Sequence, residues 1–173
     1  MKTNTLAKLQ TISGYISTLL LIMVILVSLA IIALILAVII CYSSDAIMEE
    51  ILAEFESNNI GDLAAIVVIA ILNLIVVGIS LFLMYKIFSD IKTSYTPFKA
   101  ENVRRLKNIS YLILGSSVAL PVVCWAIIST TELNPDVWVV FNPVMFAIAI
   151  LFYCISLIFA YGTELQQESD ETL

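Results

Sequence analysis

The sequence contains no histidine and only three cysteines among its 173 residues. Histidine is the commonest general base near neutral pH and the commonest metal ligand, so both kinds of chemistry lack their usual side chain. The cysteines, Cys41, Cys124 and Cys154, are far apart and form no CxxC pair, which disfavours a zinc site or a disulfide framework. We therefore expect no enzymatic activity, no catalytic residue, no cofactor and no metal site.

Charged residues are also scarce, and they are clustered. They make up 13% of the chain, against 61% hydrophobic residues, whereas a soluble domain has about 25% charged residues. A helix needs about 20 apolar residues to cross the hydrocarbon core of a bilayer, where only helices and closed barrels satisfy the backbone. We predict an all-α protein, a single domain over residues 1–173 built as a four-transmembrane-helix bundle. The charge-free stretches that support it are residues 16–42, 63–85, 109–130 and 137–161.

Basic residues are absent from two of the three connections between these stretches. All eight lysines and arginines precede residue 16 or lie within residues 86–108. The charged residues of segments 43–62 and 131–136 are all acidic. Loops rich in Lys and Arg stay in the cytoplasm. The sequence therefore predicts a multi-pass protein of the cell membrane with a cytoplasmic N-terminus, a cytoplasmic loop 86–108 and a cytoplasmic tail 162–173.

The first outer connection has a helical pattern of its own. Apolar residues at Ile47, Met48, Ile51, Leu52 and Phe55 alternate with acids, a spacing typical of an amphipathic helix. We expect a short outer helix within residues 44–58, lying on the membrane surface or extending the first transmembrane helix.

Polar residues within the four stretches are few and uncharged. The lack of ionisable side chains there disfavours a proton- or ion-coupled transporter, because such proteins place charged groups in the membrane interior. Asn73, Ser116 and Asn142 are the candidate intramembrane polar residues. They are expected to hydrogen-bond neighbouring helices, or alternatively to line a polar path.

The cytoplasmic loop contains the most distinctive polar residues. Ser94 or Thr96 is expected to cap a helix that has Pro97 in its first turn. In that helix Arg104, Arg105 and Lys107 would face lipid headgroups or a partner, or would hold the acidic tail.

Two blocks of this sequence resemble the DUF2975 family of small bacterial four-helix membrane proteins. The first block is Pro97-Phe98 followed by the run ENVRRLKNI over residues 101–109, and the second is Ile158-Phe159, Gly162 and Leu165-Gln166 followed by acids. The resemblance implies no established enzymatic activity, no cofactor and a typical neighbour that is a small helix-turn-helix repressor. The candidate partner-binding residues taken from these blocks are Pro97, Phe98, Glu101, Asn102, Arg104, Arg105, Lys107, Leu165, Gln166, Glu168, Asp170 and Glu171.

The leading hypothesis is a regulatory membrane protein that binds or signals to such a helix-turn-helix regulator through its loop and tail. Besides the lipid bilayer and this regulator, a second copy of the chain is a candidate partner, and no direct nucleic acid binding is expected. One alternative is an oligomeric pore or a protein that transports small molecules. Another is a non-catalytic scaffold or accessory subunit of a membrane complex.

Overall fold

Long helices account for nearly all of the described chain. The computed structural model describes residues 2–44, 60–94, 96–128 and 143–171, and no strand occurs in these segments. All four helices are long and apolar enough to cross a membrane, which indicates a multi-pass membrane protein and confirms the all-α prediction for this part of the chain. The helices are α1 (Lys2–Tyr42), α3 (Ile60–Ser94), α4 (Ala100–Ile128) and α5 (Pro143–Glu171).

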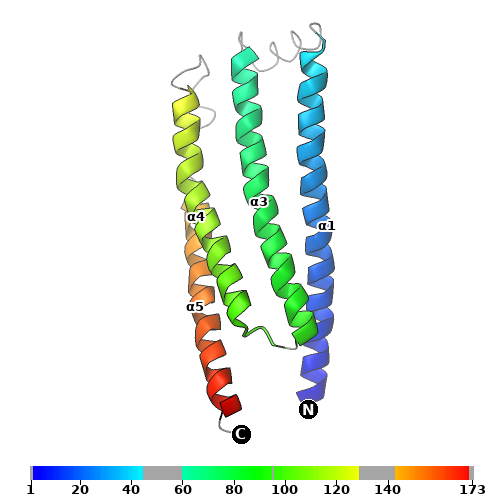
Figure 1. Ribbon diagram of the computed structural model, residues 1–173, viewed down its shortest axis with the longest axis vertical. Helices are drawn as coiled ribbons and strands as arrows, with labels where there is room; N and C mark the ends of the chain where they lie inside the picture. The colour runs from blue at the N-terminus through cyan, green and yellow to red at the C-terminus, as the bar shows by residue number, and fades with distance from the viewer. Residues whose placement is uncertain (1, 45–59, 95, 129–142, 172–173) are drawn as a thin grey trace.

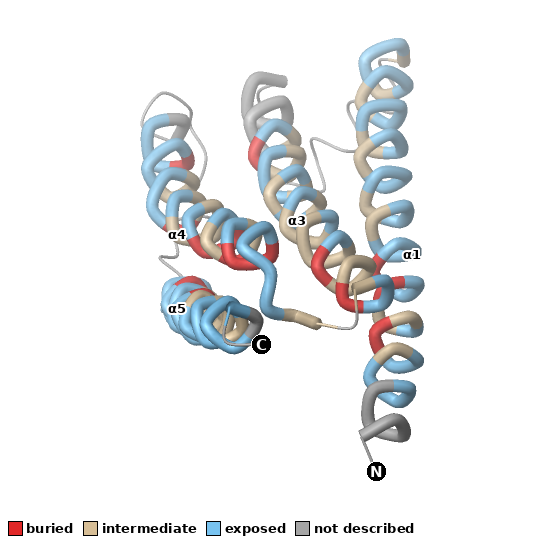
Figure 2. The backbone as a smooth tube through the Cα atoms, turned by 60° about the horizontal axis from the view of Figure 1, so that its bottom comes forward, coloured by how far each residue is buried: buried red, intermediate tan, exposed pale blue. Residues whose placement is uncertain are grey.

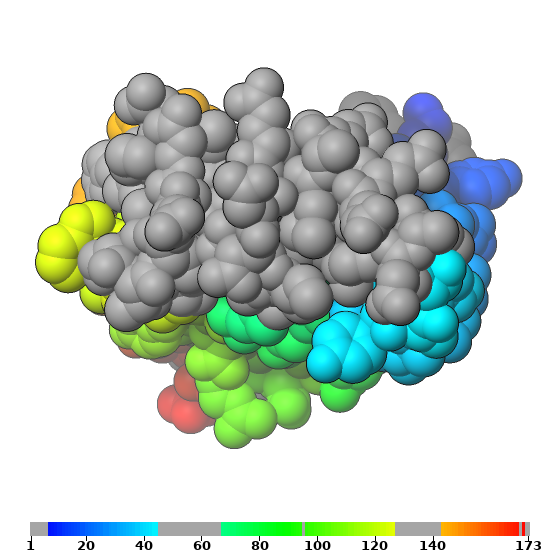
Figure 3. All heavy atoms as spheres, turned by 90° about the horizontal axis from the view of Figure 1, so that it is seen from above, coloured from blue at the N-terminus to red at the C-terminus, as the bar shows by residue number. Residues whose placement is uncertain are grey.

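The helices form an open row and not a closed bundle. Helix α1 packs against α3, α3 against α4, and α4 against α5. Helix α5 passes behind α4 in Figure 1 and lies below it in Figure 2. Seen from the end far from the termini, α1 and α4 lie on opposite sides of the molecule (Figure 3). Both chain termini lie at the same end of the helices, the lower end in Figure 1. The turn between α3 and α4 lies at this end too.

Helix α1 makes its main contact on one narrow face and leaves the rest of its apolar surface exposed. Ser13 and Ser17 are buried against the rest of the molecule, and Gly14 lies beside the aliphatic part of Lys92, 3.6 Å from where its Cβ would be. Small residues allow membrane helices to approach closely. The remaining faces carry exposed Leu and Ile along most of the helix, as expected for a helix surrounded by lipid.

The helices extend beyond the stretches that were expected to lie in the membrane. Helix α3 continues to Ser94 and α4 begins at Ala100, so most of the predicted cytoplasmic loop 86–108 is helical. Helix α5 likewise continues to Glu171, through most of the predicted tail. Hydropathy marks only the part of a helix that lipid surrounds, because a polar segment in water keeps the same backbone hydrogen bonds.

Two predicted features fall on residues that the structure does not describe. Asn142 and nearly all of the predicted outer helix, residues 45–58, lie outside the described segments. The structure therefore leaves both of them as predictions.

The best-packed part of the row lies next to the α3–α4 turn. Ile87 and Ile91 of α3 meet Leu106 and Ile109 of α4 in a buried apolar cluster, with Phe152, Ile155 and Phe159 of α5 packed against it. Figure 2 shows buried positions gathered where α3 and α4 approach the turn. This cluster holds three helices together at the end that carries all of the chain's lysines and arginines.

Candidate functional site

The turn between α3 and α4 is closed by side chains that bond its own backbone. The fully buried Asn102 donates from Nδ2 to the carbonyl oxygen of Pro97 at 3.2 Å. The Thr96 hydroxyl oxygen accepts from the backbone N–H of Phe98 at 3.2 Å, and the Ser94 hydroxyl donates to the Thr96 carbonyl at 3.1 Å. These bonds fix the direction in which α4 leaves the turn.

The predicted cap of α4 is wrong. The helix begins at Ala100, and the carbonyl of Lys99 accepts from the N–H groups of Asn102 and Val103. Lys99 therefore holds the capping position, and Pro97 lies outside the helix. The Ser94 hydroxyl bonds the carbonyls of Asp90 and Thr96 instead, and the Thr96 hydroxyl accepts from Phe98 and donates to α5.

Arg105 is the central residue of a second group, which we call the Arg105 cluster (Asp90, Glu101, Asn102 and Arg105). The guanidinium of Arg105 forms an ion pair with Asp90 on α3, donates to Oδ1 of Asn102 at 3.1 Å, and lies 3.7 Å from Glu101. Its side chain is only 15% exposed, whereas that of Arg104 is 76% exposed. Arg105 therefore ties α3 to α4, while Arg104 faces solvent.

The turn also packs against the last part of α5, in what we call the turn–tail contact (Thr96, Phe98, Phe159, Gly162 and Gln166). The ring of Phe98 lies edge-on to that of Phe159, with centroids 5.5 Å apart. A Cβ on Gly162 would come within 2.5 Å of the Phe98 ring, so only glycine permits this approach. The Thr96 hydroxyl donates to Oε1 of Gln166 at 3.0 Å.

The turn–tail contact joins the two sequence blocks that were singled out above. Phe98 belongs to the first block, and Phe159, Gly162 and Gln166 belong to the second, about 60 residues later. A family model described as "Protein of unknown function (DUF2975)" matches residues 4–173. The chain belongs to the DUF2975 family. No curated protein and no solved structure matches it.

In this DUF2975 chain three acids of the tail lie on the face of α5 that points away from the turn. Glu164 follows Gly162 by two residues, which is just over half a helical turn. Glu168 and Glu171 follow Glu164 at helical spacing, so the three share one face, and all three are exposed. The turn–tail contact thus fixes one side of this helix and leaves an acidic side exposed.

The other candidate partner-binding residues are divided between interior and surface. Lys107 is half-buried and Leu165 is exposed, whereas the side chain of Asp170 lies outside the described part of the chain. Glu101 is 57% exposed and also lies 3.6 Å from Arg104. The structure brings the block residues together, but it uses Asn102, Arg105 and Gln166 for internal bonds.

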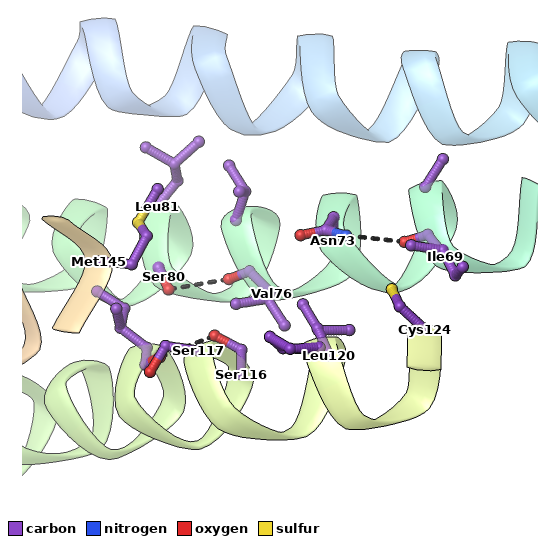
Figure 4. A pocket seen from close by; sticks show the side chains of 14 residues that line it. Ile69, Asn73, Val76, Ser80, Leu81, Ser116, Ser117, Leu120, Cys124 and Met145 are labelled. Carbon is purple, nitrogen blue, oxygen red and sulfur yellow. Dashed lines mark hydrogen bonds between the residues drawn. The ribbon is translucent and has the colours of Figure 1, made fainter. Parts of the chain in front are cut away.

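Two of the three candidate intramembrane residues line one cavity. Asn73 on α3 and Ser116 on α4 both contribute to a cavity of about 440 Å³ between these helices (Figure 4). Asn73 donates to the carbonyl oxygen of Ile69 on its own helix at 3.0 Å, and Ser116 donates to that of Ile113 at 2.9 Å. Among the described residues, therefore, neither side chain makes the expected hydrogen bond to another helix.

Sequence reasoning did not select several residues of this site. Asp90 was not selected, although it and Glu101 are the only acids between Lys86 and Lys107, and an acid among so many basic residues is a signal for an internal ion pair. Gly162 lay in the second block, but nothing in the sequence showed that its missing side chain makes room for Phe98. Thr96 was assigned a capping role and instead bonds α5.

Proposed function

We propose that this protein is a membrane-anchored regulatory protein that binds a small basic regulator at the cytoplasmic face of the cell membrane. The placement of every lysine and arginine in the N-terminal segment or in residues 86–108 supports a cytoplasmic location for both termini and the α3–α4 turn. The resemblance to DUF2975 proteins favours a helix-turn-helix repressor as the partner.

The observation that carries this proposal is the exposed acidic face of α5. Glu164, Glu168 and Glu171 lie on one side of a helix whose opposite side is fixed by the turn–tail contact. A fixed row of carboxylates has the same sign of charge as DNA phosphates, so it suits the basic surface of a DNA-binding protein. Binding to this face would compete with binding to DNA.

The strength expected of such a complex is modest and depends on salt. Exposed ion pairs contribute about 0–1 kcal/mol each, and salt screens them over about 10 Å at 0.1 M ionic strength. A partner held in this way is released readily when the surface changes. Reversible release is the property that a membrane-bound regulator of transcription requires.

The test measures binding of the neighbouring regulator to the full chain in lipid nanodiscs. The variant Glu164→Gln/Glu168→Gln/Glu171→Gln should bind about tenfold more weakly, since three pairs of about 0.5 kcal/mol each are lost. The matched control, Glu49→Gln/Glu50→Gln/Glu54→Gln, changes the net charge equally in the predicted outer connection. Equal binding by the first variant and the native chain would refute the proposal, as would an equal loss in the control.

A further inference from the structure

The cavity between α3 and α4 has the size and lining of a small-molecule site. Its volume of about 440 Å³ falls in the range of about 300–1,000 Å³ that is typical of ligand pockets. The two helices supply most of the wall, and Met145 of α5 lies at one end (Figure 4). Ala70, Ser80, Ser116 and Ser117 leave room because their side chains are small.

The serine hydroxyls of the wall are already occupied as donors. Ser80 donates to the carbonyl oxygen of Val76 at 2.9 Å, and Ser117 to that of Leu114 at 2.8 Å, as Ser116 does to Ile113. These side chains can therefore accept a hydrogen bond from a ligand but have no hydrogen left to donate. A ligand that needs several hydrogen-bond donors would find few in this wall.

Asn73 is the exception. Its amide group uses one hydrogen for the Ile69 carbonyl, and in the described part of the chain no donor reaches its Oδ1. The carboxamide therefore has an acceptor and a second N–H for a ligand. An amide oxygen without a donor in a membrane is unfavourable, so an occupant with one polar group would be stabilised there.

The position of the cavity favours an uncharged occupant. The lining contains no charged residue, and it lies in the charge-free stretches 63–85 and 109–130 and at Met145. An ionised ligand would have to give up its water without compensation. The buried cluster of Ile87, Ile91, Leu106 and Ile109 lies between the cavity and the α3–α4 turn, so a ligand from the bilayer is favoured.

We propose that the α3–α4 cavity binds a small uncharged amphiphile from the bilayer, with a hydrocarbon body and one hydroxyl or carbonyl group bonded to Asn73. A plain hydrocarbon chain would leave Oδ1 of Asn73 unpaired. Water would be a poor occupant, because most of the cavity wall is apolar. This site does not depend on the partner proposed above.

The experiment uses the purified full chain in lipid nanodiscs and two photoreactive probes, a diazirine-bearing octanol and the matching octane without a hydroxyl. After illumination, labelled peptides are identified by mass spectrometry. The alcohol should label cavity-lining segments of α3 and α4 more than the alkane does, and excess octanol should reduce this labelling.

Three variants locate the hydrogen bond. Asn73→Leu keeps the branching and the number of side-chain heavy atoms and should lower alcohol labelling about threefold, the equivalent of a typical hydrogen bond within a membrane, with alkane labelling unchanged. Ser116→Phe, which fills the cavity, should lower both. The control Ser28→Leu removes a hydroxyl on α1 that bonds only the Val24 carbonyl, and it should change neither.

Thermal unfolding of each variant distinguishes loss of the site from loss of the fold. Equal labelling by the two probes, or alcohol labelling that survives Asn73→Leu in a folded protein, would overturn the proposal and favour an acyl chain as the occupant. Alcohol labelling that is spread evenly over the lipid-exposed surface of α1 would overturn it too.

Discussion

The two halves of the α3–α4 pair are built differently. Next to the turn, α3 and α4 are joined by the Arg105 cluster and by buried isoleucine and leucine side chains, and α5 is joined to them by the turn–tail contact. Farther from the turn, the same two helices line a cavity that is open on one side, and the polar side chains in its wall bond within their own helix.

This difference shows that the specific side-chain bonds between helices are concentrated near the turn. Polar side chains near the turn bond across elements, from α3 to α4 and from the turn to α5. A rigid end suits a surface that presents charges in fixed positions, and a loosely packed interior suits a site that admits a ligand. Variants placed in each half distinguish these roles.

The largest effect is expected from the loss of the buried arginine. Arg105→Met removes the ion pair with Asp90 and leaves the Oδ1 of the buried Asn102 without its donor, so it should lower the free energy of unfolding by about 2–3 kcal/mol. The adjacent Arg104→Met, at an exposed site, should cost less than about 1 kcal/mol. Unfolding in mixed micelles measures both, and equal losses would contradict the internal role of Arg105.

An intermediate effect is expected where α5 meets the turn. Gly162→Val places side-chain atoms where the Phe98 ring lies and should cost about 1–3 kcal/mol. Gly115→Val is the matched control, because no atom lies within 4 Å of its added Cβ. A double-mutant cycle with Phe98→Ala should show coupling between the two positions, and additive losses would mean that they do not touch.

The smallest effect compares two serines on α4. Ser110 donates across to the Ala149 carbonyl of α5 at 2.8 Å, whereas Ser116 bonds its own helix. Ser110→Ala should cost about 0.6–1.7 kcal/mol, from the average to the largest value measured for hydrogen bonds between membrane helices, and Ser116→Ala close to nothing. A greater loss at Ser116 in the same unfolding assay would show that the cavity half is not the loosely packed one.

The helices could be predicted from the sequence, and their contacts could not. Four charge-free stretches of bilayer length identify four helices because the hydrocarbon core excludes charge. The extension of α3 to Ser94 and of α5 to Glu171 escaped prediction, since hydropathy carries no information about a helix in water. The open row also escaped it, because a uniformly apolar helix such as α1 does not reveal which neighbour it contacts.

The candidate site was predicted in part. The two sequence blocks contain most of its residues, but their meeting at Phe98 and Gly162 depends on a missing side chain that no pattern reveals. Arg104 and Arg105 are adjacent and chemically identical, yet one is exposed and the other is bound internally. Helix geometry separates them by 100°, and only the packing of α3 shows which one faces inward.

The most direct test of the account is the side of the membrane on which the turn and the tail lie. In a variant without native cysteines, Lys99→Cys and Glu164→Cys are treated singly with a membrane-impermeant maleimide on intact cells, with Glu54→Cys as the outer control. We predict that Cys at positions 99 and 164 reacts only after permeabilisation and that Cys at position 54 reacts in intact cells. Reaction at position 99 or 164 in intact cells would contradict the account.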